Sequence, residues 1–346
     1  MSFPKLLAVF AAILFTVIGA AAIFKGRGDS PLQSPAHKLS PIEVHLEKEV
    51  RMVAQPTPSK SQIVAVEIHQ TITAPPLPIA SPPSNSSSLS KSPDTPLPEA
   101  NRIEEFFNKN DPKFPIVQTV KYKSRVDWQK GRPAWLSDYA AHYKTSRHFI
   151  ARSLNGKPDY FKQDIVEGDK FNVLNPDKDI SFYLLIDASR SKMWFYYFDH
   201  DTHDKVLVKT YSVGLGRVDS SKVSCSLTPL GKYTLGSRIA IYKPKSKGFH
   251  NGKEVEMVRV FGTRWIPFEQ AVGDCTAPPE GFGLHGVPWV PNSKGELVAS
   301  NASLGKYESD GCIRLATEDI EELFAIIISR PTEVEIVKDF HDATAL

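Results

Sequence analysis

The residues of this chain best suited to chemistry are a cysteine and a histidine near its C-terminal end. Cys312 stands in the run Ser-Asp-Gly-Cys-Ile-Arg-Leu that begins at Ser309, and Gly286 directly follows His285. A thiol is a weak nucleophile until it is deprotonated, so a reactive cysteine needs a base or a positive charge beside it. The sequence supplies a nucleophile and a base in the order His then Cys. It therefore predicts nucleophilic catalysis by Cys312 with His285 as its partner.

The catalytic interpretation depends on the neighbours of the cysteine. An isolated cysteine is more often a small buried apolar residue, and an isolated histidine is more often a hydrogen-bonded residue of a turn. Gly311 has no Cβ, so the amide groups of Gly311 and Cys312 could face a developing oxyanion. Arg314 could hold a substrate carboxylate with two hydrogen bonds or pair with an acidic neighbour. Asp310 would disfavour a thiolate if it pointed inward, so we expect it to face solvent or pair with a cation.

A helix is predicted directly after this run. Thr317 is a plausible N-cap, and two acidic residues follow it in the first turn, where the helix dipole favours them. Apolar residues then recur at helical spacing, at Ile320, Leu323, Phe324 and Ile327. Pro331 ends the helix, and residues 333–337 alternate like a strand. Cys312 is therefore expected in a loop just ahead of a packed helix.

The segments upstream read mainly as strands. Residues 182–186, 193–198 and 206–213 are rich in aromatic and branched side chains, which favours a β-sandwich or barrel-like core with few helices. The aromatic run 194–198 is more typical of core than of a sugar-stacking surface. Asp and His alternate in residues 199–204, but no matched ligand set accompanies them, so we predict a solvated turn and neither a metal nor a cofactor.

These motifs together resemble the catalytic domain of the YkuD-type L,D-transpeptidases, which crosslink bacterial peptidoglycan. Besides His-Gly and Ser-x-Gly-Cys-Ile-Arg-Leu, residues 228–233 (Thr-Pro-Leu-Gly-Lys-Tyr) and 262–266 (Gly-Thr-Arg-Trp-Ile) are similar to family segments. Several motifs in one order are more specific than any single motif. The resemblance implies a mainly β catalytic domain at residues 179–340 with its site in a cleft at one side. Asp310 departs from the family pattern, in which His or Arg often stands there.

The resemblance also implies a mechanism. The thiol would attack the carbonyl of the diamino-acid residue in a peptidoglycan tetrapeptide stem, release the terminal D-Ala and form a thioester. An amine of a second stem would then attack the thioester, which gives a crosslink. The implied catalytic residues are Cys312, His285, Gly286 (which would orient the imidazole) and Gly311, and the residues implied to shape the pocket or bind substrate are Ser309 and Arg314.

Two rival functions keep the same residues. Water could resolve the thioester, which would give an L,D-carboxypeptidase or a hydrolase of crosslinks. Alternatively the domain could be a catalytically inactive protein that only binds the wall, for which Asp310 is one supporting feature. A papain-like or NlpC-like protease is disfavoured because those families place Cys before His.

Composition limits the partners and the compartment. The net charge is only +3 and there is no basic run, so the sequence gives no support for nucleic acid binding. Residues 6–24 form an uncharged apolar stretch, so residues 1–25 are predicted as a membrane anchor or a signal segment. Either role places the rest of the chain outside the cytoplasm. Together with this, the family resemblance implies an inner-membrane-anchored or secreted protein of the cell envelope, in the periplasm or cell wall, whose partners are peptidoglycan stem peptides and glycan strands.

Two further regions precede the catalytic domain. Residues 26–115 are predicted as a disordered linker, because 8 Pro and 7 Ser fall within residues 75–98. Residues 116–176 are predicted to form two short helices, at 135–143 and 146–154, followed by a strand at 165–174. This α+β unit resembles a degenerate LysM module, which binds glycans containing N-acetylglucosamine, although a plain helical hairpin packed on the catalytic domain is an alternative.

Three cysteines are compatible with an oxidising compartment. If Cys312 is kept free for chemistry, Cys225 and Cys275 remain as one possible disulfide or as two unpaired thiols. The sequence does not decide between these states because the distance between them is unknown.

Overall fold

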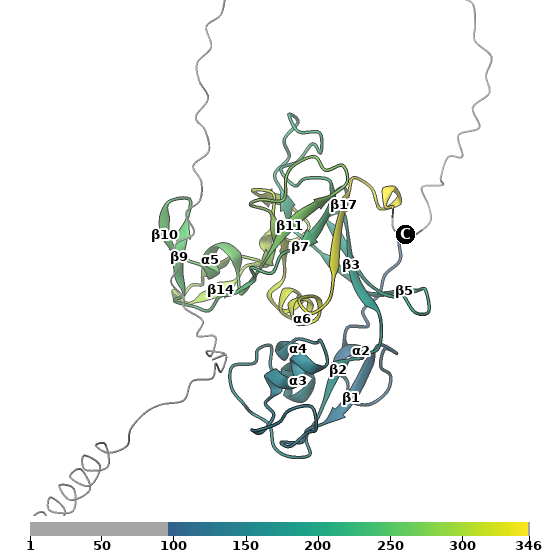
Figure 1. Cartoon of the computed structure of the whole chain (residues 1–346). Helices are drawn as coiled ribbons and strands as arrows, with labels where there is room; N and C mark the ends of the chain where they lie inside the picture. The colour runs from purple at the N-terminus through teal and green to yellow at the C-terminus, as the bar shows by residue number, and fades with distance from the viewer. Residues whose placement is uncertain (1–95, 345–346) are drawn as a thin grey trace, which may run out of the picture. The chain divides into compact units, whose positions relative to one another are not determined.

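The structure is a computed structural model that describes residues 96–344 (Figure 1). The predicted anchor or signal segment at residues 1–25 and linker residues 26–95 lie outside the described residues. Within residues 96–344, no helix is both long enough and apolar enough to span a membrane.

A curled nine-stranded sheet dominates the C-terminal part, so the prediction of a mainly β fold for this part is confirmed. Its strand order is β16-β12-β11-β7-β17-β3-β4-β5, with β8 paired to β11. The bounds are β3 Ile180–Asp187, β4 Lys192–Asp199, β5 Asp204–Ser212, β7 Gly231–Leu235, β8 Ala240–Ile241, β11 Arg264–Val272, β12 Gly283–Gly286, β16 Ile313–Leu315 and β17 Thr332–Val337.

The aromatic and branched residues of the sequence explain the centre of this sheet. β3, β4 and β5 form an antiparallel meander, and β17 pairs with β3 in parallel, from Thr332 opposite Phe182 to Val337 opposite Asp187. Both faces of β3 and β4 are buried, and Trp194 and Phe195 are fully enclosed. A strand covered on both faces reads as a continuous apolar run, as this one does. The aromatic run is therefore core, as predicted.

Short strands and helices surround the sheet. Two hairpins and one parallel pair lie outside it, formed by β9 Lys247–His250 with β10 Lys253–Glu256, β13 Trp289–Pro291 with β14 Leu297–Ala299, and β6 Leu215–Gly216 with β15 Tyr307–Ser309. The helical segments among them are α5 Val258–Phe261, η1 Asn301–Ser303 and η2 Phe340–Asp342.

Helix α6 (Thr317–Ile327) follows the cysteine loop, as the sequence predicts. Its apolar stripe, including Ile320 and Leu323, is fully buried in the main core, and each such side chain contributes about 1.5–3 kcal/mol of burial free energy. The predicted N-cap is wrong. Ala316 occupies that position and its carbonyl accepts the Ile320 amide (3.0 Å), whereas the Thr317 hydroxyl is buried inside the first turn without a partner.

An N-terminal module has the element order strand, helix, helix, strand. Its elements are β1 Val117–Lys121, α3 Leu136–His142, α4 Arg147–Asn155 and β2 Lys170–Leu174, and β1 pairs with β2 antiparallel. Ser146 caps α4 by accepting the Phe149 amide (2.9 Å), and Gly156 ends it in a left-handed conformation. The two helices and the closing strand fall within the segments where they were expected, β1 precedes them, and the glycan-binding identity of the module stays a prediction.

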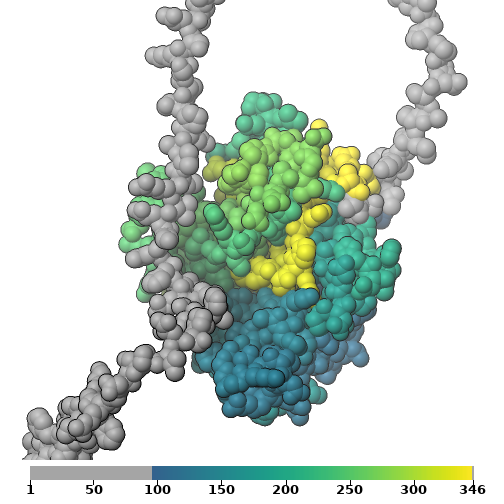
Figure 2. Space-filling model, in the orientation of Figure 1, coloured from purple at the N-terminus to yellow at the C-terminus, as the bar shows by residue number. Residues whose placement is uncertain are grey.

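The module lies directly against the catalytic domain (Figure 2). The Ser146 hydroxyl donates to the Ala325 carbonyl of α6 (2.5 Å), and α4 packs on α6. The helical hairpin is therefore docked on the domain.

The predicted end of the linker is placed too late. Residues 98–115 belong to the folded part, and α2 (Glu104–Phe107) buries Phe106 and Phe107 in the main core together with Phe114. The Trp194 indole also donates to the Pro98 carbonyl (2.7 Å). The Pro/Ser composition ends near residue 98, and the aromatic residues after it have apolar surface to bury. We therefore correct the boundary from residue 115 to about residue 97.

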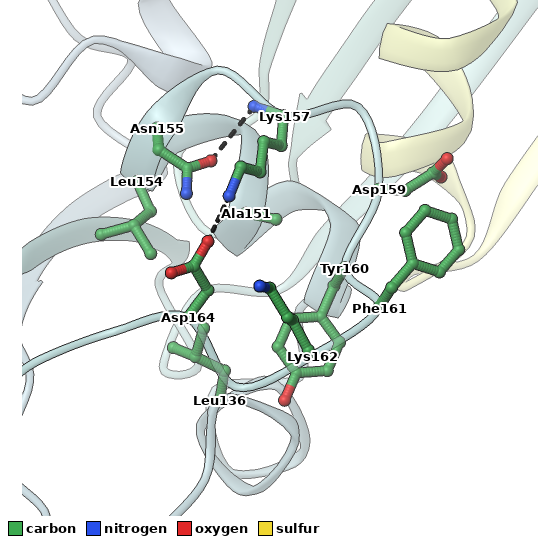
Figure 3. A pocket seen from close by; sticks show the side chains of 10 residues that line it. All are labelled: Leu136, Ala151, Leu154, Asn155, Lys157, Asp159, Tyr160, Phe161, Lys162 and Asp164. Carbon is green, nitrogen blue, oxygen red and sulfur yellow. Dashed lines mark hydrogen bonds and ion pairs between the residues drawn. The ribbon is translucent and has the colours of Figure 1, made fainter.

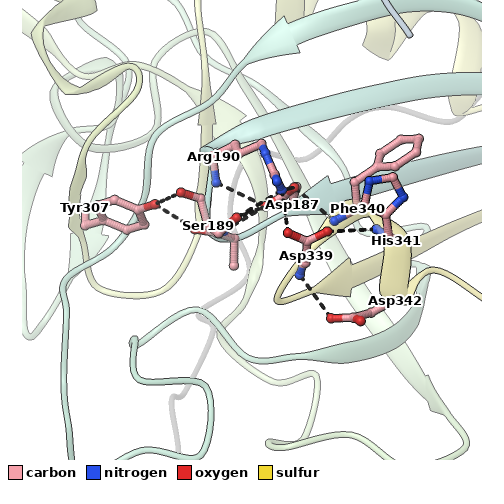
Figure 4. A network of polar contacts seen from close by, with 9 residues as sticks. Asp187, Ser189, Arg190, Tyr307, Asp339, Phe340, His341 and Asp342 are labelled. Atoms are coloured by element: carbon pink, nitrogen blue, oxygen red, sulfur yellow. Dashed lines mark hydrogen bonds and ion pairs between the residues drawn. The ribbon is translucent and has the colours of Figure 1, made fainter. Parts of the chain in front are cut away.

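A polar network ties the β3–β4 turn to the strand that precedes the cysteine loop (Figure 4). Buried Asp187 accepts the amides of Ser189 (2.8 Å) and Arg190 (3.0 Å) at the turn, and the Phe340 amide (2.9 Å) from η2. The Tyr307 hydroxyl of β15 contacts the Ser189 carbonyl (3.0 Å) on the same turn. The chain leading to the cysteine is thus anchored to the central sheet.

Candidate active site

Two neighbouring strands bring His285 and Cys312 together. β12 and β16 pair in parallel, with His285 opposite Arg314. Residues of alternate parity face opposite sides of a sheet, so Leu284 and Ile313 enter the core while His285, Arg314 and Cys312 share the other side. From strand spacing and rise, the Cα atoms of His285 and Cys312 are roughly 8 Å apart. The pairing of the two strands thus brings together residues that are 27 positions apart in the sequence.

The turn before the cysteine can be built only with glycine. Gly311 has φ +119°, a conformation that side chains rarely adopt. A Cβ there would lie 2.4 Å from Phe282 Cε1 and 2.7 Å from the Leu227 carbonyl oxygen. Gly311 is therefore required by both backbone conformation and space.

Two buried hydroxyls fix this turn. Ser309, 1% exposed, donates to the Cys312 carbonyl (2.7 Å) and accepts the Gly311 amide (3.1 Å). Thr228 donates to the Gly311 carbonyl (3.0 Å) and accepts the Gly216 amide (2.7 Å). The Ser309 hydroxyl is thus occupied by the turn, which fits the expectation that it shapes the pocket.

His285 is almost fully buried, with 3% exposure. Its Nδ1 lies 2.7 Å from the Gly286 carbonyl, the contact expected for Gly286, and the rings of Phe261 and Trp265 flank the imidazole with centroids at 5.4 and 6.0 Å. Burial lowers the pKa of His285 to about 4, and the Gly286 carbonyl opposes this shift only in part. The imidazole is therefore neutral near pH 7. Since Nδ1 is hydrogen-bonded to the Gly286 carbonyl, Nε2 is the ring nitrogen that remains available to accept a proton.

Cys312 is partly exposed, and its thiol donates weakly to the Gly281 carbonyl (3.5 Å). Burial raises the pKa of Cys312 to about 11, while a backbone contact with Gly283 and the charge of Arg314 lower it. The resting sulfur is therefore a thiol. Because His285 is neutral beside it, the arrangement favours a base that takes the proton during attack over a preformed ion pair.

The two charged residues of the motif have different surroundings. Arg314 is half-buried, its Nε has no hydrogen-bond partner, and no carboxylate of residues 96–344 forms an ion pair with it. Burial lowers the pKa of Arg314. Asp310 is exposed and pairs with Arg217 (2.6 Å), so of the two expected surroundings, solvent or a cation, it has both.

The other two cysteines are not bridged. Cys225 is exposed and Cys275 is partly buried, with its thiol donating to the Lys232 carbonyl (3.1 Å). Of the two states that the sequence left open, the structure has the unpaired thiols.

Sequence reasoning missed several positioning residues. Thr228, Gly262 and Trp265 lie in segments that resemble the family, yet no role was predicted for any of them. Gly262, φ +60°, allows the chain to pass Gly286, whose carbonyl carbon would be 2.7 Å from an added Cβ. Only the three-dimensional neighbours reveal these roles, although Thr-Pro-Leu-Gly was a usable signal for Thr228.

Comparison with known families agrees with this geometry. Residues 181–336 match YkuD, the L,D-transpeptidase catalytic domain. The match includes His285 and Cys312 and falls within the predicted 179–340. It supports an L,D-transpeptidase catalytic domain in this part of the chain. No curated protein gives a significant match.

Solved structures show weak likeness. Bd1075 of Bdellovibrio bacteriovorus is 14% identical, with a TM-score of 0.31, over 46% of this chain and 48% of that one. The helical cell shape determining protein Pgp2 of Campylobacter jejuni is 13% identical, with a TM-score of 0.29, over 47% and 49%. The chain thus spans about half the length of these structures, and likeness at this level supports no functional assignment.

Proposed function

We propose that the chain is a cysteine-dependent L,D-transpeptidase that crosslinks peptidoglycan stem peptides. The observation that carries the proposal is the shared face of β12 and β16, to which the strand register assigns both a neutral, backbone-oriented imidazole and a partly exposed thiol. The family match to residues 181–336 supports the substrate class.

The reaction starts with proton transfer. As Cys312 Sγ attacks the carbonyl carbon of the diamino-acid residue, its proton passes to His285 Nε2. The C–N bond to the terminal D-Ala then breaks, and its nitrogen takes that proton as it leaves, so a thioester remains on the sulfur. An amine of a second stem attacks the thioester, and sulfur departs as the thiol. No electrons are gained or lost in either step.

The backbone and Arg314 supply the charge stabilisation. The Gly311 amide donates to the Ser309 hydroxyl (3.1 Å), so the proposed donor to the oxyanion is the Cys312 amide. Gly311 contributes its conformation instead. Arg314, half-buried and in no ion pair within the described part of the chain, is the group proposed to hold a stem carboxylate.

The proposal includes the surroundings of the enzyme. Its substrate lies in the cell envelope, which fits a role of residues 1–25 as an anchor or signal segment. Residues 116–176 are the proposed glycan-binding module, which would raise the local concentration of substrate.

Intact-mass analysis with a disaccharide-tetrapeptide tests the chemistry. Wild-type protein should gain the mass of the disaccharide-tetrapeptide minus that of D-Ala, and Cys312→Ala should gain nothing while keeping its melting temperature. Cys225→Ala is the matched control, because it removes an exposed thiol elsewhere, and it should acylate like wild type.

The products separate the rival functions. A crosslinked dimer indicates transfer to an amine, and a free tripeptide indicates hydrolysis of the same thioester. An adduct or turnover in Cys312→Ala would refute the assignment of the nucleophile, and a folded wild type that forms no adduct would favour the wall-binding alternative.

A further inference from the structure

A charged residue is buried between the N-terminal module and the catalytic strand β11. Arg264 is 1% exposed, and its Nη1 donates to the Thr263 carbonyl (2.8 Å). Its guanidinium also lies over the Phe324 ring of α6, 5.3 Å from the centroid. A guanidinium removed from water in this way needs a compensating carboxylate.

The module supplies the closest carboxylate. Asp159 lies on the loop that follows α4, and its Oδ1 accepts from Arg264 Nη2 at 2.7 Å. In Figure 3 its side chain points towards α6, away from the ion pair of Lys157 and Asp164 on the same loop. The pKa of Asp159 is lowered: burial alone would raise it, but His148 (3.5 Å) and Arg264 outweigh that effect. A second carboxylate, Glu321, is farther from Arg264, at 3.7 Å.

The residues adjacent to Arg264 in sequence hold the imidazole. Trp265 is the cross-strand partner of His285, and its ring lies against the imidazole on the opposite side of the strand from Arg264. Phe261, three residues before Arg264, contacts the imidazole edge to face. The segment 261–265 therefore joins the buried ion pair on one face to the histidine on the other.

We propose that Asp159 is a positioning residue of the active site, which fixes β11 through Arg264 and thereby holds His285 in line with Cys312. This inference rests on the proposed function, because holding His285 in line with Cys312 matters only if the two residues act in catalysis. The module is accordingly an integral part of the catalytic unit rather than a domain that only tethers it to a polymer.

The physical reason is the cost of an unpaired buried charge. Without the Asp159 carboxylate, the guanidinium either moves towards Glu321 or draws water into the interface, and both responses displace β11. Positions of catalytic groups matter on the scale of 1 Å, at which losses of about a hundredfold occur. Asp159 never touches the reacting atoms, so its effect must pass through the imidazole.

The test measures the reactivity of Cys312 without any peptidoglycan. The full chain is treated with iodoacetamide from pH 6 to 12, a range that includes the pKa of the Cys312 thiol, and alkylation of the Cys312 peptide is followed by mass spectrometry. The variants are Asp159→Asn, which keeps shape and removes charge, and the matched control Asp164→Asn on the same loop. Melting temperatures are recorded for each.

For Asp159→Asn we expect the alkylation midpoint to move to higher pH and the rate at pH 7 to fall about tenfold, because a displaced base no longer takes the thiol proton. Asp164→Asn should match wild type. A folded Asp159→Asn with wild-type rate and midpoint would overturn the proposal. A loss of melting temperature alone, with the pH profile unchanged, would also overturn it, because that is a purely structural role.

If Asp159→Asn does not fold, Arg264→Lys decides. Lysine keeps the buried cation but cannot reach both the Thr263 carbonyl and Asp159 in the same geometry. An upward shift of its alkylation midpoint supports the proposal, and a wild-type profile refutes it. Failure of the proposed function is distinguishable, since it would show as wild-type protein that alkylates normally but forms no thioester with a disaccharide-tetrapeptide.

Discussion

Replacement of Gly311 by alanine is the sharpest test of how the catalytic turn is built. The turn has φ +119° at this residue, and the added methyl group would sit 2.4 Å from the Phe282 ring and 2.7 Å from the Leu227 carbonyl. The Leu227 contact is with backbone, which cannot move aside as a flexible side chain can. Alanine must therefore either strain the turn or shift it together with Cys312.

Two costs add in the first case. Holding a non-glycine residue at this φ costs about 1–3 kcal/mol, and overpacking a close contact costs about 1–3 kcal/mol more. The free energy of unfolding should then fall by about 2–6 kcal/mol, which is a large share of the roughly 5–15 kcal/mol of a typical domain. If the turn shifts instead, the loss of stability is smaller and the loss of thiol reactivity is larger.

Urea unfolding and alkylation of Cys312 measure the two responses. Gly295→Ala is the matched control, because Gly295 also has a positive φ (+79°) but nothing lies within 4 Å of an added Cβ. It should show the conformational cost of about 1–3 kcal/mol alone, with normal alkylation. If Gly311→Ala equals Gly295→Ala in both stability and alkylation rate, the account of the turn is wrong.

Two more predictions concern the groups around Cys312. The pKa of His285 is about 4 when folded and about 6.5 when unfolded, so the unfolded state binds the proton first. The contribution of neutral His285 to the free energy of unfolding should be fully present above pH 6.5 and should fall by roughly 3 kcal/mol as the pH is lowered towards 4. In urea titrations, His285→Gln should lack this fall. Ser309→Ala leaves the Gly311 amide and the Cys312 carbonyl without their partner, so it should cost about 1–3 kcal/mol in urea unfolding and slow acylation; unchanged acylation would refute a positioning role.

The sequence by itself predicted the parts of the structure that follow from local patterns. Apolar runs and helical spacing predicted strands β3, β4 and β17 and helix α6, because burial of those side chains dominates over other local preferences. It also predicted that Asp310 would either face solvent or pair with a cation. Residue types and order were enough to single out Cys312 and His285, since few side chains can act as nucleophile and base.

Boundaries and caps were less predictable. The folded part begins near residue 98 because Phe106, Phe107 and Phe114 bury their rings in a core formed mainly by residues more than 60 positions away. Thr317 is a good cap by type, yet tertiary packing encloses it in the first turn of α6. Local preferences of about 1 kcal/mol are overridden by such packing.

The tertiary structure alone decided which residues support the site. The parallel register of β12 and β16 sets His285 beside Cys312, and nothing in a local pattern specifies that register. Thr228 bonds to the cysteine turn from 84 positions away in sequence, and Asp159, 153 positions from the cysteine, contacts Arg264 of the strand beside His285. The sequence alone determines the chemical type of each side chain. Its burial, its pKa and its orientation towards other catalytic groups depend on which residues folding brings next to it.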